Sequence, residues 1–104
     1  MLTFVAITGK ELMKIVMIGA GNVATNIAKT LAKIGETPTQ IWSRTLASAE
    51  ALAGTVDSCA TSDWNSVMKD ADVYIVSVKD DAMLGVIEQL CSRCKHGVFV
   101  HTAG

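Results

Sequence analysis

Residues 19–24 carry the motif of this chain that points most directly to chemistry. They fit the pattern Gly-x-Gly-x-x-Ala, as Gly19, Ala20, Gly21, Asn22, Val23 and Ala24. In that pattern the first glycine permits a tight turn, the second lets a pyrophosphate approach the backbone, and the small last residue lets a helix pack on a strand. The N–H groups that begin the helix would then face the phosphates. The alternative is a turn of small residues that serves close packing alone.

The next polar segment indicates which dinucleotide would fit. A site for NAD or FAD usually carries Asp or Glu about 20 residues after the glycines, where it binds the ribose hydroxyls. Here the chain has Trp42, Ser43, Arg44 and Thr45, and no acid lies between positions 37 and 49. An arginine attracts a 2′-phosphate, Ser43 and Thr45 can add hydroxyl hydrogen bonds, and Trp42 is a candidate to flank the adenine. We therefore expect NADP(H) rather than NAD(H), with a solvated arginine, a capping serine and a core tryptophan as the alternatives.

Further candidate contacts follow the last two apolar runs. Val78, Lys79 and Asp80 come after one run, and His101 ends the other. Ligands of open α/β sheets bind beyond the carboxyl ends of the strands, so these residues would border the ribose and nicotinamide. The alternatives are a rim charge for Lys79, a helix start for Asp80 and a structural role for His101. No side chains form a convincing acid–base pair, so the catalytic residues remain unassigned.

The hydrophobic pattern supplies alternating elements that would position these residues. Short apolar runs predict buried strands, and apolar residues spaced three or four apart predict amphipathic helices. The expected strands cover residues 14–18, 39–42, 55–60, 72–78 and 97–101. The expected helices cover residues 22–34, 46–53, 63–69 and 80–93, with Gly35 and Gly54 ending the first two. This order predicts an α/β fold, a doubly wound parallel sheet of about five strands with helices on both faces.

Composition excludes several other classes of protein. The chain has 104 residues, a formal net charge of −1, 50% hydrophobic residues and 18% charged residues. This fits one domain and is too apolar for a disordered chain and too weakly basic for a nucleic-acid binder. No apolar run approaches the roughly 18 residues of a membrane helix. Residues 1–12 lack the basic start of a secretory signal, so we expect an N-terminal extension followed by one domain over residues 13–104.

Three cysteines, Cys59, Cys91 and Cys94, favour a reducing cytosol, because their number is odd and no secretion signal precedes them. Cys91 and Cys94 have the Cys-x-x-Cys spacing of zinc and redox sites. However, the pair closes a predicted helix instead of opening it, and a second ligand pair is lacking. We favour chance spacing and expect no metal site, with metal or redox use as the alternative.

Four segments together resemble a known family. They are Met-Lys-Ile-Val-Met-Ile-Gly-Ala-Gly-Asn-Val-Ala, Trp-Ser-Arg, Asp-Val-Tyr-Ile-Val-Ser-Val-Lys-Asp-Asp and Val-His-Thr-Ala-Gly. In this order, over residues 13–104, they resemble the N-terminal Rossmann-like domain of pyrroline-5-carboxylate reductase-like and related NADP-dependent oxidoreductases. The resemblance implies NADP(H) at residues 19–24, Ser43, Arg44 and residues 78–80. It also implies a following helical domain that supplies dimerisation and much of the substrate pocket, and we expect that the sequence stops short of such a domain.

One departure from the family concerns the substrate. Reductases proper usually have Lys-Pro after the fourth strand, whereas Asp80 follows Lys79 here, which puts imino-acid reduction in doubt. We expect a cytoplasmic NADP(H)-binding oxidoreductase domain for hydride transfer to or from a small C=N or C=O substrate. Activity and a homodimer would need the helical domain, and neither nucleic acid nor membrane is an expected partner. The alternative is a non-catalytic nucleotide-sensing, regulatory or scaffold domain.

Overall fold

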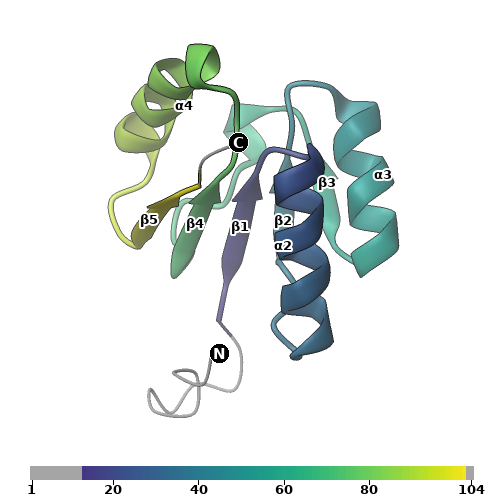
Figure 1. The fold of residues 1–104 in the computed structure, drawn as a ribbon. Coiled ribbons are helices and arrows are strands. Elements are labelled where there is room, and N and C mark those ends of the chain that lie inside the picture. The colour runs from purple at the N-terminus through teal and green to yellow at the C-terminus, as the bar shows by residue number, and fades with distance from the viewer. Residues whose placement is uncertain (1–12, 103–104) are drawn as a thin grey trace.

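The computed structural model describes residues 13–102, so the expected extension at residues 1–12 lies outside the described residues. One sheet of five parallel strands forms the centre of the fold, in the order β3-β2-β1-β4-β5 (Figure 1). The strands are β1 Ile15–Ile18, β2 Gln40–Trp42, β3 Cys59–Thr61, β4 Val73–Val76 and β5 Val98–His101. The helices are α2 Asn22–Lys33, α3 Leu46–Val56 and α4 Asp80–Arg93, and Trp64–Ser66 forms the 3-10 turn η1.

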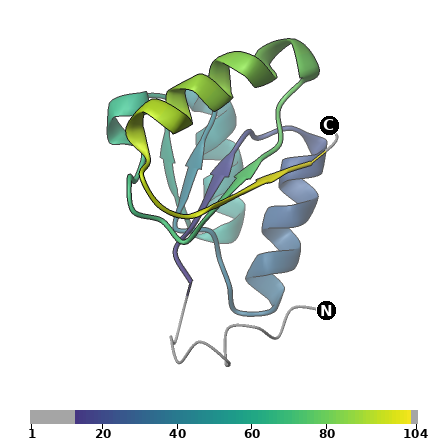
Figure 2. The same ribbon diagram turned by 90° about the vertical axis from the view of Figure 1, so that its left-hand side faces the viewer.

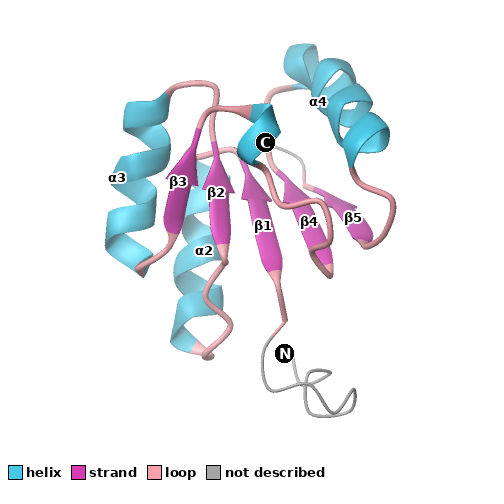
Figure 3. Ribbon diagram, turned by 180° about the vertical axis from the view of Figure 1, so that it is seen from behind, coloured by secondary structure: helices cyan, strands magenta, loops and turns pink. Residues whose placement is uncertain are grey.

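Two hydrophobic clusters, one on each face of the sheet, hold the helices in place. α2 and α3 cover one face and α4 covers the other, as Figures 2 and 3 show. Along β1, Ile15 and Met17 pack with α2 and α3, whereas Val16 and Ile18 pack with α4, and none of the four is more than 3% exposed. A strand buried on both faces needs a continuous apolar run. The predicted doubly wound parallel sheet is therefore confirmed.

The strand order reverses at the centre of the sheet. From β1 the chain adds β2 and β3 outward on one side, then crosses back to β4 and β5 on the other side of β1. In such sheets a crevice opens at the carboxyl ends of the strands where the order reverses, here β1 and β4. The topology thus places the glycine turn after β1 beside the loop after β4. No helix within residues 13–102 is long and apolar enough to cross a membrane.

The first and last helical predictions agree well with the structure. The helix expected over residues 80–93 forms with those bounds. The helix expected over residues 22–34 ends one residue earlier, and Gly35 follows with a φ of +81°, a conformation that favours glycine at a helix end. The strands expected over residues 14–18, 39–42, 72–78 and 97–101 are all present, each shorter by one to three residues.

Gly54 does not end α3, contrary to the sequence prediction. The helix continues to Val56, and Asp57 ends it in the left-handed conformation with a φ of 61°. A Cβ built on Gly54 would meet no atom within 4 Å, so this glycine lowers helix propensity without obstructing the helix. The extra turn of helix occupies residues that were expected in a strand over 55–60, and β3 is confined to Cys59–Thr61.

The helix expected over residues 63–69 is also wrong, since only η1 forms there. The side chain of Gln40 explains the difference: its Nε2 donates to the carbonyl oxygen of Ser66 at 2.7 Å, and its Oε1 accepts from the N–H of Met68 at 2.8 Å. These bonds from β2 take backbone groups that a longer helix would pair internally. The segment between β3 and β4, which we call the crossover, therefore forms no longer helix and is hydrogen-bonded to β2.

Candidate functional site

A cavity of about 690 Å³ opens at the carboxyl ends of β1, β2 and β4. Its walls are residues 19–23 after β1, residues 42–44 at the end of β2, residues 77–79 after β4, Trp64, and one side of α4. Hydrogen bonds beyond the strands tie these ends together: Gly19 N–H donates to the Trp42 carbonyl at 2.7 Å, and Ser77 N–H donates to the Ile18 carbonyl at 2.8 Å. The volume lies in the range of pockets that hold small molecules and cofactors.

The two glycines of the turn have different surroundings. Gly19 has a φ of +121°, and a Cβ built there would lie 2.1 Å from the carbonyl oxygen of Ser77, so no other residue fits without a backbone shift. Gly21 has a φ of −82°, which other residues adopt, and a Cβ there would meet no atom within 4 Å. Gly19 thus lets the turn pack on the backbone that follows β4, whereas Gly21 leaves open space at the wall of the cavity.

The start of α2 is suited to an anion. Gly21 is the N-cap of α2, no side chain caps the helix, and its first turn contains no acidic residue. The N–H groups of that turn have no partner within the helix, and they carry a partial positive charge. Asn22 and Val23 line the cavity beside Gly21. Ala24 is fully buried in the cluster between α2 and the sheet, which fits the packing role expected of it, and it lies outside the cavity wall.

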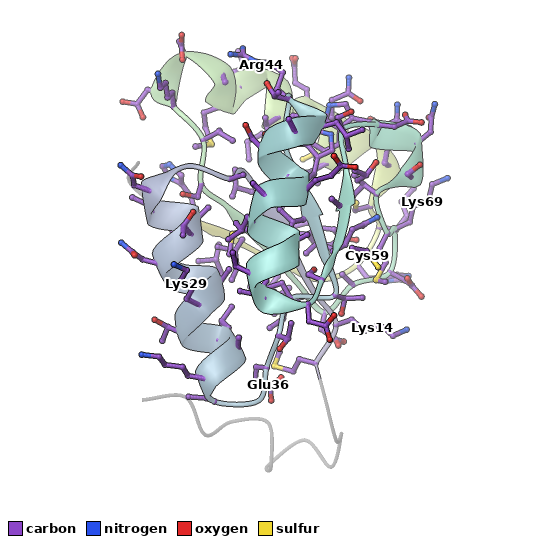
Figure 4. The ribbon with its side chains drawn as sticks, turned by 90° about the vertical axis from the view of Figure 1, so that its right-hand side faces the viewer. Lys14, Lys29, Glu36, Arg44, Cys59 and Lys69 are labelled. Atoms are coloured by element: carbon purple, nitrogen blue, oxygen red, sulfur yellow. The ribbon has the colours of Figure 1, made fainter. Side chains whose placement is uncertain are left out.

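The start of α3 forms the second polar part of the wall. Ser43 is 9% exposed, and its Oγ accepts from the N–H of Thr45 at 3.3 Å, which leaves the hydroxyl proton free to donate. Arg44 is exposed at the rim, at the end of the molecule opposite Glu36 (Figure 4). Thr45 is the N-cap of α3 and does not line the cavity. Like α2, α3 has no side-chain cap and no acid in its first turn.

The start of α4 differs, because Asp80 and Asp81 occupy its first turn. Carboxylates at that position offset the positive end of the helix, so α4 is the least favourable of the three helix starts for a phosphate. Lys79, its N-cap, is exposed and lines the cavity together with Val78 and Asp81. Asp80 lies outside the wall. His101 is exposed at the end of β5 and also lies outside it.

Besides Ser77, two parts of the wall were not assigned from the sequence. One is Trp64, whose indole stacks on that of Trp42 with ring centroids 4.2 Å apart and planes 26° apart. The other is one side of α4, and its lining residues beyond Asp81 are Ala82, Gly85, Val86 and Gln89. Their spacing of three or four along a predicted helix is a signal that could have marked this side of α4. No comparable spacing indicates Trp64, because it reaches the cavity only through the folding of the segment between β3 and β4.

The cysteine pair closes α4, as expected, with Cys91 exposed and Cys94 buried at the C-cap. Within residues 13–102, no three His, Cys, Asp or Glu side chains are grouped so that they could hold a metal ion.

Comparisons with known proteins agree with this architecture. Residues 14–103 match the family described as NADP oxidoreductase, coenzyme F420-dependent. A Bacteroides fragilis structure named as an NADP oxidoreductase superposes with a TM-score of 0.82 and 41% identity, over 88% of this chain and 36% of its own. A pyrroline-5-carboxylate reductase from Coxiella burnetii gives a TM-score of 0.77 and 25% identity, over 88% and 35%.

A third structure shares the fold alone. It is an imine reductase from Myxococcus stipitatus in complex with NADP⁺, with a TM-score of 0.69 and 22% identity over 86% of this chain and 32% of its own. The chain therefore spans about a third of the length of each of these proteins. Among curated proteins the comparison found no significant match.

Proposed function

Because the chain belongs to the coenzyme F420-dependent NADP oxidoreductase family, as its sequence resemblance to NADP-dependent oxidoreductases indicated, we propose that it binds NADP(H) in the cavity and presents it for hydride transfer. The chain forms a Rossmann-like domain of an NAD(P)-dependent oxidoreductase family. The observation that carries the proposal is one cavity that joins the glycine turn, an uncapped α2 and the Ser43–Arg44 segment. Residues 13–104 would form the cofactor domain.

The start of α2 would hold the pyrophosphate. Gly21 leaves room for phosphate oxygens to reach the backbone, and the N–H groups of the first turn, including those of Asn22 and Val23, supply donors. Gly19 acts indirectly, since its tight packing on Ser77 brings the turn next to the loop after β4. Nothing in this part of the wall distinguishes NADP(H) from NAD(H).

The end of β2 would make that distinction. Arg44 supplies a fixed positive charge, and its guanidinium can form two hydrogen bonds to a phosphate. Ser43 can donate its hydroxyl, and the start of α3 adds an uncompensated partial positive charge. A carboxylate at this place would favour NAD(H) by binding the ribose hydroxyls, and the sequence has no acid between positions 37 and 49. The preference proposed for this chain is therefore NADP(H).

The indole of Trp42 supports the fit of an aromatic nucleotide. Trp42 lines the cavity with 6% of its surface exposed. A flat base can stack on an aromatic ring of this kind.

Bound NADP(H) would supply the hydride, and the substrate would be a small molecule with a C=N or C=O group. Lys79 and His101 stay candidates for the reacting end, with Lys79 the nearer to the proposed cofactor because it lines the cavity. The related structures are nearly three times as long as their matched part, so we propose that a helical domain beyond these residues completes the substrate site. That domain would also mediate dimerisation, and the cytosol would be the site of action.

Calorimetric titration with NADPH and, separately, with NADH tests the proposal. We expect NADPH to bind at least tenfold more tightly than NADH, a difference of about 1.4 kcal/mol. Equal affinities would contradict the role of Ser43 and Arg44. Binding of neither, in these residues and in a longer chain, would leave a scaffold as the better explanation. Binding without turnover in the longer chain would favour the sensing alternative.

A further inference from the structure

The end of the cavity near β2 is aromatic. The stacked rings of Trp42 and Trp64, which we call the indole wall, both line it. They come from separate elements, Trp42 from β2 and Trp64 from η1, so their contact depends on how the crossover packs. The Trp42 N–H is buried without an acceptor among residues 13–102, which is uncommon for a donor in a protein core.

α4 borders the same cavity with small residues. Ala82 and Gly85 line it, and a Cβ built on Gly85 would meet no atom within 4 Å. η1 and α4 belong to the same face of the sheet, since Trp64, Val86 and Leu90 pack in one hydrophobic cluster. The cavity therefore has aromatic rings on the side of β2 and η1 and open space beside a glycine of α4. A flat aromatic ring suits such a space, because it can stack on an indole without meeting a bulky side chain.

Two neighbouring elements and a cap of its own hold the segment that carries Trp64. Gln40 of β2 bonds to the backbone at Ser66 and Met68, and Arg93 of α4 donates from Nη1 to Asn65 Oδ1 at 2.7 Å. Asp63 caps η1, with its Oδ1 accepting from the N–H of Asn65 at 2.9 Å. The crossover is thus held from both β2 and α4 on either side of the indole. A wall ordered before a ligand arrives lowers the entropic cost of binding.

From these observations we infer that Trp64 is a specificity-determining residue for the nucleotide base, an inference that rests on the proposed cofactor site. The indole wall offers its aromatic surface to the purine. Gln40 and Arg93 are positioning residues that hold Trp64 on Trp42. The nicotinamide end of the cofactor makes no use of the wall.

Calorimetric titration of Trp64→Leu and Trp64→Phe against three probes tests this role. The probes are NADPH, 2′,5′-ADP, which has the base but no nicotinamide, and reduced nicotinamide mononucleotide, which has no adenine. Leucine keeps apolar cover over the core, whereas phenylalanine also keeps a ring. We expect Trp64→Leu to bind NADPH and 2′,5′-ADP about tenfold more weakly, within the range for lost base stacking, with the mononucleotide unchanged. Trp64→Phe should retain most of the affinity. Equal affinities of wild type and Trp64→Leu for 2′,5′-ADP would overturn the inference.

A second pair of variants keeps folding separate from binding. Gly85→Leu replaces a helical glycine with a better helix former, but its side chain would enter the space proposed for the base. Gly54→Leu makes the same change on α3, outside the cavity. We expect both variants to fold with unchanged or raised melting temperature and only Gly85→Leu to lose 2′,5′-ADP. If wild type binds NADPH and Gly85→Leu binds 2′,5′-ADP equally well, the inference fails while the proposed function stands. If wild type binds no NADPH, either in these residues or in a longer chain, both fail.

Discussion

Gly19 lies directly against Ser77: a Cβ on this glycine would be 2.1 Å from the Ser77 carbonyl oxygen. The oxygen belongs to the backbone after β4, so it cannot turn aside as a flexible side chain would. The φ of +121° at Gly19 adds strain for any other residue. We predict that Gly19→Ala lowers the free energy of unfolding by at least about 2 kcal/mol. Urea unfolding followed by circular dichroism measures this loss, and a change within ±0.5 kcal/mol would refute the geometry.

Gly21→Ala is predicted to weaken cofactor binding and to leave stability nearly unchanged. The φ of −82° suits alanine, and the new methyl group would meet no atom within 4 Å, so stability should hardly change. The methyl group would, however, stand where a pyrophosphate is proposed to approach the backbone. We expect at least tenfold weaker NADPH binding by calorimetry. The contrast with Gly19→Ala is the control, and equal loss of stability in the two variants would contradict the separate roles of the glycines.

Arg44→Ala is predicted to weaken NADPH binding about tenfold or more and NADH binding by less than about threefold. The reason is the charged hydrogen bonds that an arginine makes to a phosphate, each worth about 1.5–3 kcal/mol. Lys29→Ala is the matched control: it removes one positive charge from the exposed side of α2, outside the cavity (Figure 4). Parallel losses for both cofactors would show that Arg44 contacts a group that the two share and not the 2′-phosphate. An equal effect of Lys29→Ala would show that Arg44 acts only through the net charge.

The regions predicted well are those whose signals are local. The helix over residues 80–93 has its acids at the start and its apolar residues at helical spacing, and β1 is a buried apolar run. Each element can therefore be predicted from its own residues alone. The structure of the crossover cannot be predicted in this way. Its residues have a helical pattern, but two hydrogen bonds from Gln40, about 26 positions earlier in the chain, take backbone groups that a helix would pair internally.

The same distinction applies to the candidate site. The glycine turn and the Ser43–Arg44 segment were recognised because short motifs carry their chemistry. Trp64 was not assigned to the site, since only the sheet order brings the crossover beside the end of β2. Gly85 escaped notice for a different reason: a glycine inside a helix weakens a helical pattern, and only the packed structure shows the space beside it. His101 is a residue that the sequence suggested and the cavity does not include. Its place at a strand end suggested a contact with the ligand, and the fold leaves it outside the cavity wall.

Gly54→Ala is predicted to stabilise the chain by about 0.5–1 kcal/mol. Gly54 lies inside α3, it is exposed, and a Cβ there would meet no atom, so alanine gains helix propensity without a clash. Thermal unfolding should show the gain as a rise of a few degrees in melting temperature, with cofactor affinity unchanged. A loss of stability would mean that α3 ends at Gly54, as the sequence pattern suggested.

The chain's one tyrosine gives a prediction about high pH. Tyr74 is fully buried, and this burial raises the pKa of its phenol well above the ordinary value; the neighbouring Cys94 raises it further. Its hydroxyl donates to the carbonyl of Met68 and accepts from the N–H of Ala71 at 3.2 Å. Folding therefore favours the protonated phenol, whereas in the unfolded chain the phenol ionises near its ordinary pKa of about 10.

It follows that the contribution of Tyr74 to stability is complete below about pH 10 and is lost as the pH rises from there towards the raised pKa of the folded state. The expected slope is about 1.4 kcal/mol per pH unit for one proton. Phenolate absorbance should appear together with loss of circular dichroism, because the phenol ionises only when the core opens. Tyr74→Phe should be less stable at neutral pH, through its lost hydrogen bonds, but should lack this part of the alkaline slope. A phenolate that appears near pH 10 in a chain whose circular dichroism is intact would contradict the burial of Tyr74.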